Sequence, residues 1–115
     1  MTKYIDVAET IGTPSALVQE LGDIIYNEIS SAFDNDESVC LDFSNVESMI
    51  SPFLNNAIGK LYGKYTSHQI KEHLNLVNFP REKNATLNLV IANAKKYYSN
   101  KDMYEKTEKE VIGIE

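Results

Sequence analysis

The residues whose types could support chemistry gather between positions 39 and 65. An apolar run there ends in Asp42, short polar residues follow, and Ser51-Pro52 signals the start of a helix. A serine, a histidine and an aspartate can form a nucleophilic triad, and Ser51, His73 and Asp42 are the members that this chain offers. Because no Gly-x-Ser-x-Gly turn surrounds Ser51, the local sequence does not support a triad. We expect no catalytic residues, and hence a protein that is not an enzyme.

Metal and cofactor sites have no matching pattern either. The two histidines, His68 and His73, stand five residues apart with no ligand-like cluster around them. The acidic run at 34–37 lacks the sixth-position glycine and the twelfth-position glutamate of an EF-hand calcium loop. The five glycines are scattered, so the chain has no glycine-rich phosphate loop. We therefore expect neither a metal nor a cofactor.

Ser51 has two interpretations. Serine before proline is a common helix opening, in which the hydroxyl accepts a backbone N–H of the first turn, and this interpretation is favoured. In the other interpretation the hydroxyl is exposed and phosphorylated, which adds nearly two negative charges where the helix dipole tolerates them. An alternative hypothesis places a small anion or nucleotide at this helix N-terminus. Pro52 weakens the phosphorylation hypothesis in part, because it removes one N–H that could hold the phosphate.

Composition and charge narrow the class of protein. The chain has 115 residues, one domain's length, with 43% hydrophobic and 24% charged residues. Its net charge of −6 argues against nucleic acid as the partner. No apolar run approaches the ~18 residues of a membrane span, and the N-terminus lacks a signal peptide's apolar centre. The single cysteine, Cys40, fits a buried position in a protein of the reducing cytoplasm.

The hydrophobic pattern predicts alternating strands and helices. We expect strands at 3–8, 38–43 and 74–79, and helices at 14–32, 51–65 and 81–98. This βαβαβα order is typical of an α/β fold, with a small, mainly parallel sheet and helices packed on it. The apolar run 39–41 indicates a central strand covered on both faces. Gly59 and Gly63 would allow the second helix to pack closely against the sheet.

Residues 1–99 are expected to form one α/β domain. The polar tail, 100–115, is predicted to be either a helix or an edge strand. Tyrosines in the last helix and the tail, at positions 97, 98 and 104, support a third hypothesis, a structural homodimer.

The run Leu41–Leu54, LDFSNVESMISPFL, resembles the STAS-like domains of bacterial proteins of unassigned function. Their signature reads (V/L)-x-L-D-F-x-x-V-x-x-(I/M)-(S/T)-x-x-F-(L/A) and is followed by a helix. The later run Leu76–Phe79 and the helical Leu89-Val90-Ile91 fit the second block of that family. The resemblance spans about Tyr4 to Tyr98 and implies a STAS-like fold.

More distantly, the chain is similar to STAS domains proper, the anti-sigma factor antagonists. Asn45-Val46 matches their "N-V", and Ser51 falls on the serine that is phosphorylated. Ile50, Pro52 and Phe53 depart from their Asp-Ser-Ser-Gly turn.

The resemblance implies a non-catalytic regulatory domain that binds a protein partner. Relatives bind, or are phosphorylated by, ATP-binding proteins of the histidine-kinase type, so a partner-switching pair is expected. The partner would dock on the corner at 42–56, with Ser51 as the phosphorylation site. The residues expected to contact it are Asp42, Ser44, Asn45, Met49, Phe53 and Asn55.

Overall fold

A three-stranded parallel sheet forms the centre of the molecule. The computed structural model describes residues 1–114, with side chains as far as Ser99. The strands are β1 (Thr2–Asp6), β3 (Ser38–Asp42) and β5 (Leu74–Val77), in the order β1-β3-β5. The register places Tyr4, Cys40 and Asn75 in one row across the sheet. The predicted α/β fold with a small parallel sheet is confirmed, and the 38–43 strand lies at its centre.

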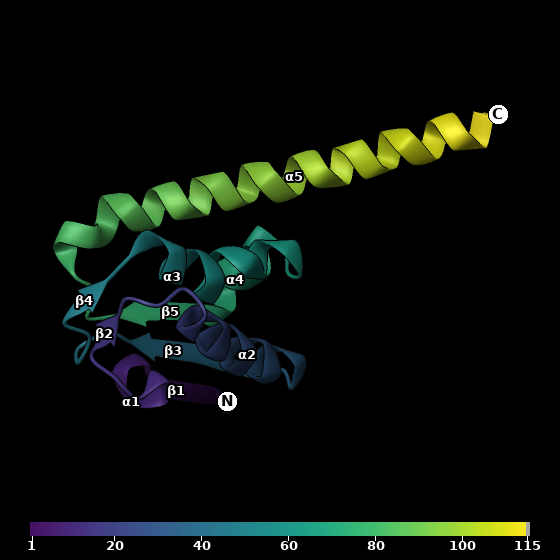
Figure 1. Ribbon diagram of the computed structural model, residues 1–115. Coiled ribbons are helices and arrows are strands. Elements are labelled where there is room, and N and C mark those ends of the chain that lie inside the picture. Colours follow the sequence, from purple (N-terminus) through teal and green to yellow (C-terminus); the bar gives the residue numbers. More distant parts are fainter. Residues whose placement is uncertain (115) are drawn as a thin grey trace.

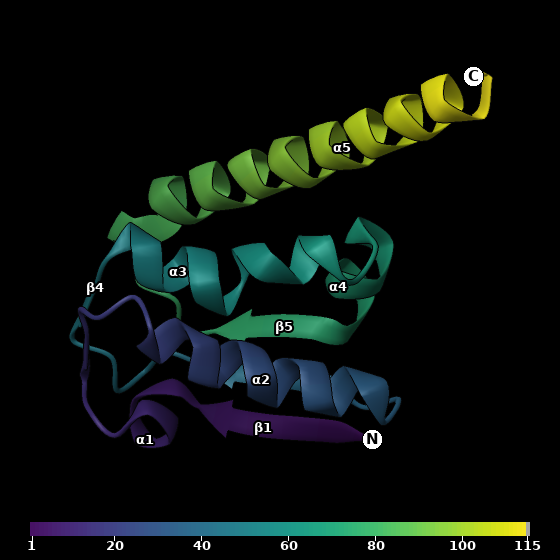
Figure 2. The ribbon, with the colours of Figure 1, turned by 45° about the vertical axis from the view of Figure 1, so that its right-hand side comes forward.

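Helices cover one face of this sheet in two layers (Figure 1). Helix α2 (Leu21–Asp34) and helix α3 (Ser51–Ala57) pack side by side. The long helix α5 (Asn84–Ile114) lies over α3 and over the 3-10 helix η1 (Gly59–Gly63), and its far end extends beyond the body (Figure 2). None of the described helices is long and apolar enough to cross a membrane.

The opposite face of the sheet is open. Ile5, Val39 and Leu41 are buried beneath the helices, whereas Tyr4 is 60% exposed and Cys40 is only half-buried. The expectation that the central strand is covered on both faces, with Cys40 in the core, is therefore wrong. The strand order runs in one direction, so two right-handed crossovers bring both helices to the same face.

The N-terminal third differs from the predicted elements. The first strand ends at Asp6, whose carboxylate caps the short helix α1 (Val7–Ile11), and Gly12 ends that helix with φ 81°. The helix expected at 14–32 starts only at Leu21. Before it, β2 (Ser15–Ala16) pairs in parallel with β4 (Ser48–Met49), and the Thr13 hydroxyl accepts the Ser15 N–H in a turn instead of capping a helix.

The second predicted helix, at 51–65, is divided in two. Helix α3 ends at Ala57, and the chain continues in η1. A Cβ added at Gly59 would lie 3.5 Å from Val90, and one at Gly63 would lie 2.5 Å from the Tyr98 ring, so both glycines face α5 and not the sheet. The connector that follows contains helix α4 (Ser67–His73), which Thr66 and Gln69 begin with a capping box. The 3-10 helix η2 (Arg81–Lys83) precedes α5.

Gly22 allows the closest approach within the helical layer. A Cβ at this position would lie 2.5 Å from the Phe53 carbonyl oxygen and 2.8 Å from the Asn56 Cβ. Both neighbours belong to α3, and the first is backbone, so neither can move without shifting the helix. Phe53, Leu54 and Ala57 are fully buried at this contact. The glycine therefore lets α2 and α3 share one face of the sheet.

Gly22→Ala should destabilise the fold by about 1–3 kcal/mol, because the added methyl overpacks a backbone contact. Ser31→Ala is the matched control, since Ser31 is an exposed position of the same helix. It should change the free energy of unfolding by no more than about 0.5 kcal/mol. Urea unfolding measures both values. Equal stability of the two variants would contradict the close approach at Gly22.

Candidate functional site

Asp42 is the centre of a polar cluster at the carboxyl end of the sheet. Its side chain is buried, yet both oxygens have partners. Its Oδ1 accepts the Ser44 backbone N–H at 2.9 Å and the Asn78 amide Nδ2 at 3.0 Å, and the Tyr4 hydroxyl donates to its Oδ2. The Asn78 amide, followed by the Ser44 N–H, holds the pKa of Asp42 below its ordinary value. The carboxylate that looked out of place at the end of an apolar strand is thus ionised and satisfied.

A second carboxylate lies one strand away. Asp6 is the register partner of Asp42; its Oδ1 accepts the Glu9 N–H at 3.1 Å, and its Oδ2 accepts the Asn45 amide Nδ2 at 2.9 Å. The structure therefore brings together three predicted residues, Asp42, Ser44 and Asn45, and adds Asp6, Tyr4 and Asn78. Those three residues were not predicted from the sequence. Asp6 and Asn78 each stand at the end of a parallel strand, and that placement could have revealed them.

Ser51 lies elsewhere, at the start of α3. The cap position of this helix is Ile50, and no side chain caps it. The favoured interpretation, a capping serine, is therefore wrong, because the chain enters the helix one residue earlier than expected. Ser51 is instead the first helical residue, and its side chain is exposed.

Besides the buried Asp42, two more of the expected contact residues are not on the surface. Met49 is 3% exposed in β4, and Phe53 is fully buried against α2. The expectation that they are exposed is wrong. Met49 is covered because β4 pairs with β2, and Phe53 is covered because its position in the first turn of α3 faces the core. Neither side chain can touch a partner while the fold is intact.

Ser51 and Asn55 line a groove between α3 and α5. The groove has a volume of about 520 Å³. Leu89, which is 61% exposed, contributes apolar surface to it. The other lining residues are Gln19, Pro52, Thr86, Val90 and Asn93, so no charged side chain among those that the structure describes lines the groove. Leu17 and Val18, each 50% exposed, directly precede Gln19 and extend the apolar character of this corner.

The possible triad is not assembled. Asp42 ends β3, whereas the His73 Nδ1 lies 3.0 Å from the Ser38 hydroxyl, at the start of the same strand. Ser51 lies on α3 and contacts neither. Within the part of the chain that the structure describes, no group of His, Cys, Asp and Glu is arranged to hold a metal ion.

The hydrogen bonds of Asp42 predict how stability depends on pH. Folding lowers the pKa of Asp42 below 3.8, so its ionised form stabilises the fold above that pH, and the contribution is lost as the pH falls through the lowered pKa. Asp42→Asn should be less stable than the wild type near neutral pH, and the difference should shrink below pH 3.8. Urea unfolding at a series of pH values measures it.

Glu47→Gln serves as the control, because Glu47 is an exposed carboxylate close in sequence. Its difference from the wild type should not vary in the same way. If the Asp42→Asn difference stayed constant from neutral pH to well below pH 3.8, the assigned role of the Asp42 hydrogen bonds would be wrong.

Comparison with known proteins concerns the sequence of the chain and gives a match to a family. Searches of curated proteins and of solved structures gave no significant match. Residues 22–81, more than half of the chain, match the family described as "STAS-like domain of unknown function (DUF4325)". The matched segment runs from α2 through β3 and α3 to β5, and so includes Ser51 and the Asp42, Ser44, Asn45 and Asn78 members of the polar cluster, but not Tyr4 or Asp6. The chain belongs to this family of STAS-like domains.

Proposed function

We propose that this chain is a non-catalytic regulatory domain of the bacterial cytoplasm that binds a protein partner at the groove between α3 and α5. The observation that carries the proposal is the surface of that groove. It combines an exposed apolar side chain, Leu89, with neutral hydrogen-bonding groups such as Ser51 and Asn55. The buried centres of protein interfaces are depleted in most charged residues and are more apolar than the surrounding surface.

The absence of charged residues from the lining of the groove is unusual for this chain. About a quarter of its residues are charged and its net charge is −6, yet none of the groove's eight lining residues is charged. A partner can therefore cover this surface without burying an unpaired ion, which would cost several kcal/mol. Membership in a STAS-like family supports a binding role, in line with the resemblance to anti-sigma factor antagonists.

Phosphorylation of Ser51 would switch this surface. The hydroxyl is exposed at the first position of α3, so a phosphate can be added without disturbing the core. It would place nearly two negative charges on a groove that otherwise has none. The partner we propose is an ATP-binding protein of the histidine-kinase type, which would both dock at the groove and transfer the phosphate.

The other two hypotheses have weaker support. Helix α3 has seven residues and includes Pro52 in its first turn, so few N–H groups are free to hold an anion or a nucleotide. For a homodimer, Tyr98 is already packed on Gly63, whereas Tyr97 is exposed. Tyr104 lies outside the side chains that the structure describes.

Leu89→Glu should weaken binding of the partner at least about tenfold, because it buries an unpaired charge in the interface. The partner is first identified by co-purification from the native host and mass spectrometry, and is then purified for affinity measurements. Asn88→Glu is the matched control, since it adds the same charge at an exposed neighbouring position outside the groove. The proposal fails if both variants bind like the wild type or lose affinity equally.

Incubation with the purified partner and MgATP should phosphorylate Ser51, and Ser51→Ala should abolish the modification while Ser48→Ala retains it. Intact-mass and peptide mass spectrometry show the site. The phosphorylated chain should bind the partner at least about tenfold more weakly. Phosphate on Ser51 without any change in affinity would remove the switch but leave the docking surface intact.

A further inference from the structure

An aromatic pocket lies at the end of the molecule opposite the carboxyl ends of the strands. It is lined by residues from the end of α2, the turn before β3, and helix α4 with the segment before it. Its volume is about 150 Å³, which is roughly the volume that five water molecules occupy in the liquid. The lining residues are Phe33, Asp36, Glu37, Tyr65, Gln69 and His73. None of the proposed interactions at the α3–α5 groove involves them.

Three rings form the walls of this pocket at steep angles to one another. The centroids of the Phe33 and Tyr65 rings are 5.1 Å apart, with an angle of 82° between the planes. The centroids of the Phe33 and His73 rings are 6.3 Å apart, at 67°. Rings set at steep angles line different sides of a common space, and the faces of Phe and Tyr rings attract organic ammonium groups by cation–π attraction.

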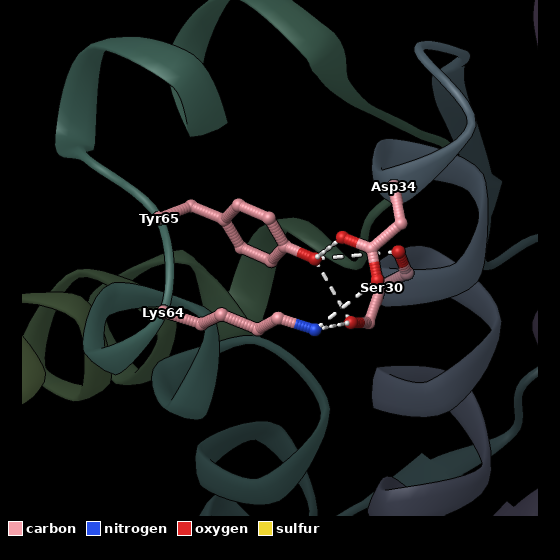
Figure 3. Close-up of polar contacts among 4 residues, drawn as sticks. All are labelled: Ser30, Asp34, Lys64 and Tyr65. Carbon is pink, nitrogen blue, oxygen red and sulfur yellow. Dashed lines mark hydrogen bonds and ion pairs between the residues drawn. The ribbon is translucent and has the colours of Figure 1, made fainter.

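The Tyr65 ring is fixed in place from its hydroxyl end. Figure 3 shows the hydroxyl pointing at Asp34 and Ser30 of α2, with Lys64 beside it. The Tyr65 hydroxyl lies 2.8 Å from the Asp34 Oδ1 and 2.9 Å from the Ser30 hydroxyl, and the Lys64 Nζ bonds the same two side chains. The Tyr65 hydroxyl, and after it Lys64, hold the pKa of Asp34 below its usual range. The ring is therefore preorganised, which reduces the entropy lost on binding.

His73 is held as well, by the contact of 3.0 Å between its Nδ1 and the Ser38 hydroxyl. The charged residues at the pocket indicate whether a ligand would be a cation or an anion. Two carboxylates, Asp36 and Glu37, line the pocket, and no Lys or Arg among the side chains described as far as Ser99 does. Neither carboxylate forms an ion pair among the described side chains. Lys64 is already paired with Asp34, and its Nζ lies 5.4 Å from the centroid of the Tyr65 ring.

We propose that this pocket binds an alkylammonium group. The aromatic walls would contact its methyl or methylene groups, and Asp36 and Glu37 would offset its charge. The group could belong to a free small molecule or to a lysine side chain of a protein, since the pocket recognises the ammonium and not the remainder of the ligand. This binding is independent of the function proposed for the α3–α5 groove.

The test is a titration with choline, followed by the backbone amide signals of the ¹⁵N-labelled full chain. The neutral isostere 3,3-dimethylbutan-1-ol has the same shape without the charge. Choline should give saturable shifts at 33–37, 65, 69 and 73, and the isostere should bind at least about tenfold more weakly. Equal shifts with both compounds, or no saturable shift with choline or with a lysine derivative, would overturn the proposal.

The double variant Asp36→Asn, Glu37→Gln should weaken choline binding about tenfold without unfolding the chain. Asparagine tolerates the left-handed backbone of position 36, where φ is 60°. Glu47→Gln is the matched control and should bind choline like the wild type. Tighter binding of N-acetyl-trimethyllysine methylamide than of choline would assign the site to a protein side chain, and the reverse order to a free cation. Unchanged affinity of the double variant would refute the role of the carboxylates.

Discussion

The close approach of α2 to α3 at Gly22 is the constraint on which the rest of the structure depends. The strand order β1-β3-β5 advances in one direction, so both crossovers reach the same face of a narrow sheet. Two helices can share that face only if their backbones come close, and Gly22 removes the Cβ that would strike the Phe53 carbonyl. With α3 in place, α5 can lie over it, and the groove beside Ser51 forms between them. The same arrangement leaves Tyr4 and Cys40 on an open face.

The parts of the fold that follow from local pattern could be predicted from the sequence. The apolar run at 39–41 identifies the central strand, and the alternation of strands with helices indicates a parallel sheet. Pairing between distant short segments has no such signal. Strands β2 and β4 contain two residues each, and they exist only because they meet each other. Leu17 and Leu21 are spaced as in a helix, and for this reason the segment that contains β2 was predicted to be helical. In the structure Leu17 is half-exposed and belongs to no helix.

In the candidate site, too, the residues close together in sequence could be predicted and those brought together by packing could not. Asp42, Ser44 and Asn45 were expected together from their sequence neighbourhood, and the structure brings them together. Gln19 and Leu89 reach the Ser51 groove from far along the chain, and only the packing of α5 on α3 places them there. Burial also could not be inferred at Met49 and Phe53. Their large apolar side chains are equally typical of an interface and of a core.

The molecule thus has a neutral groove at one end and an acidic, aromatic pocket at the other, on a scaffold whose helices share a single face. The central claim is that the α3–α5 groove is the partner's docking surface. Hydrogen–deuterium exchange of the chain, alone and with its purified partner, tests it most directly. Binding should slow exchange at 51–55 and 86–93 and leave 33–37 unchanged. Protection confined to any other surface would contradict the claim.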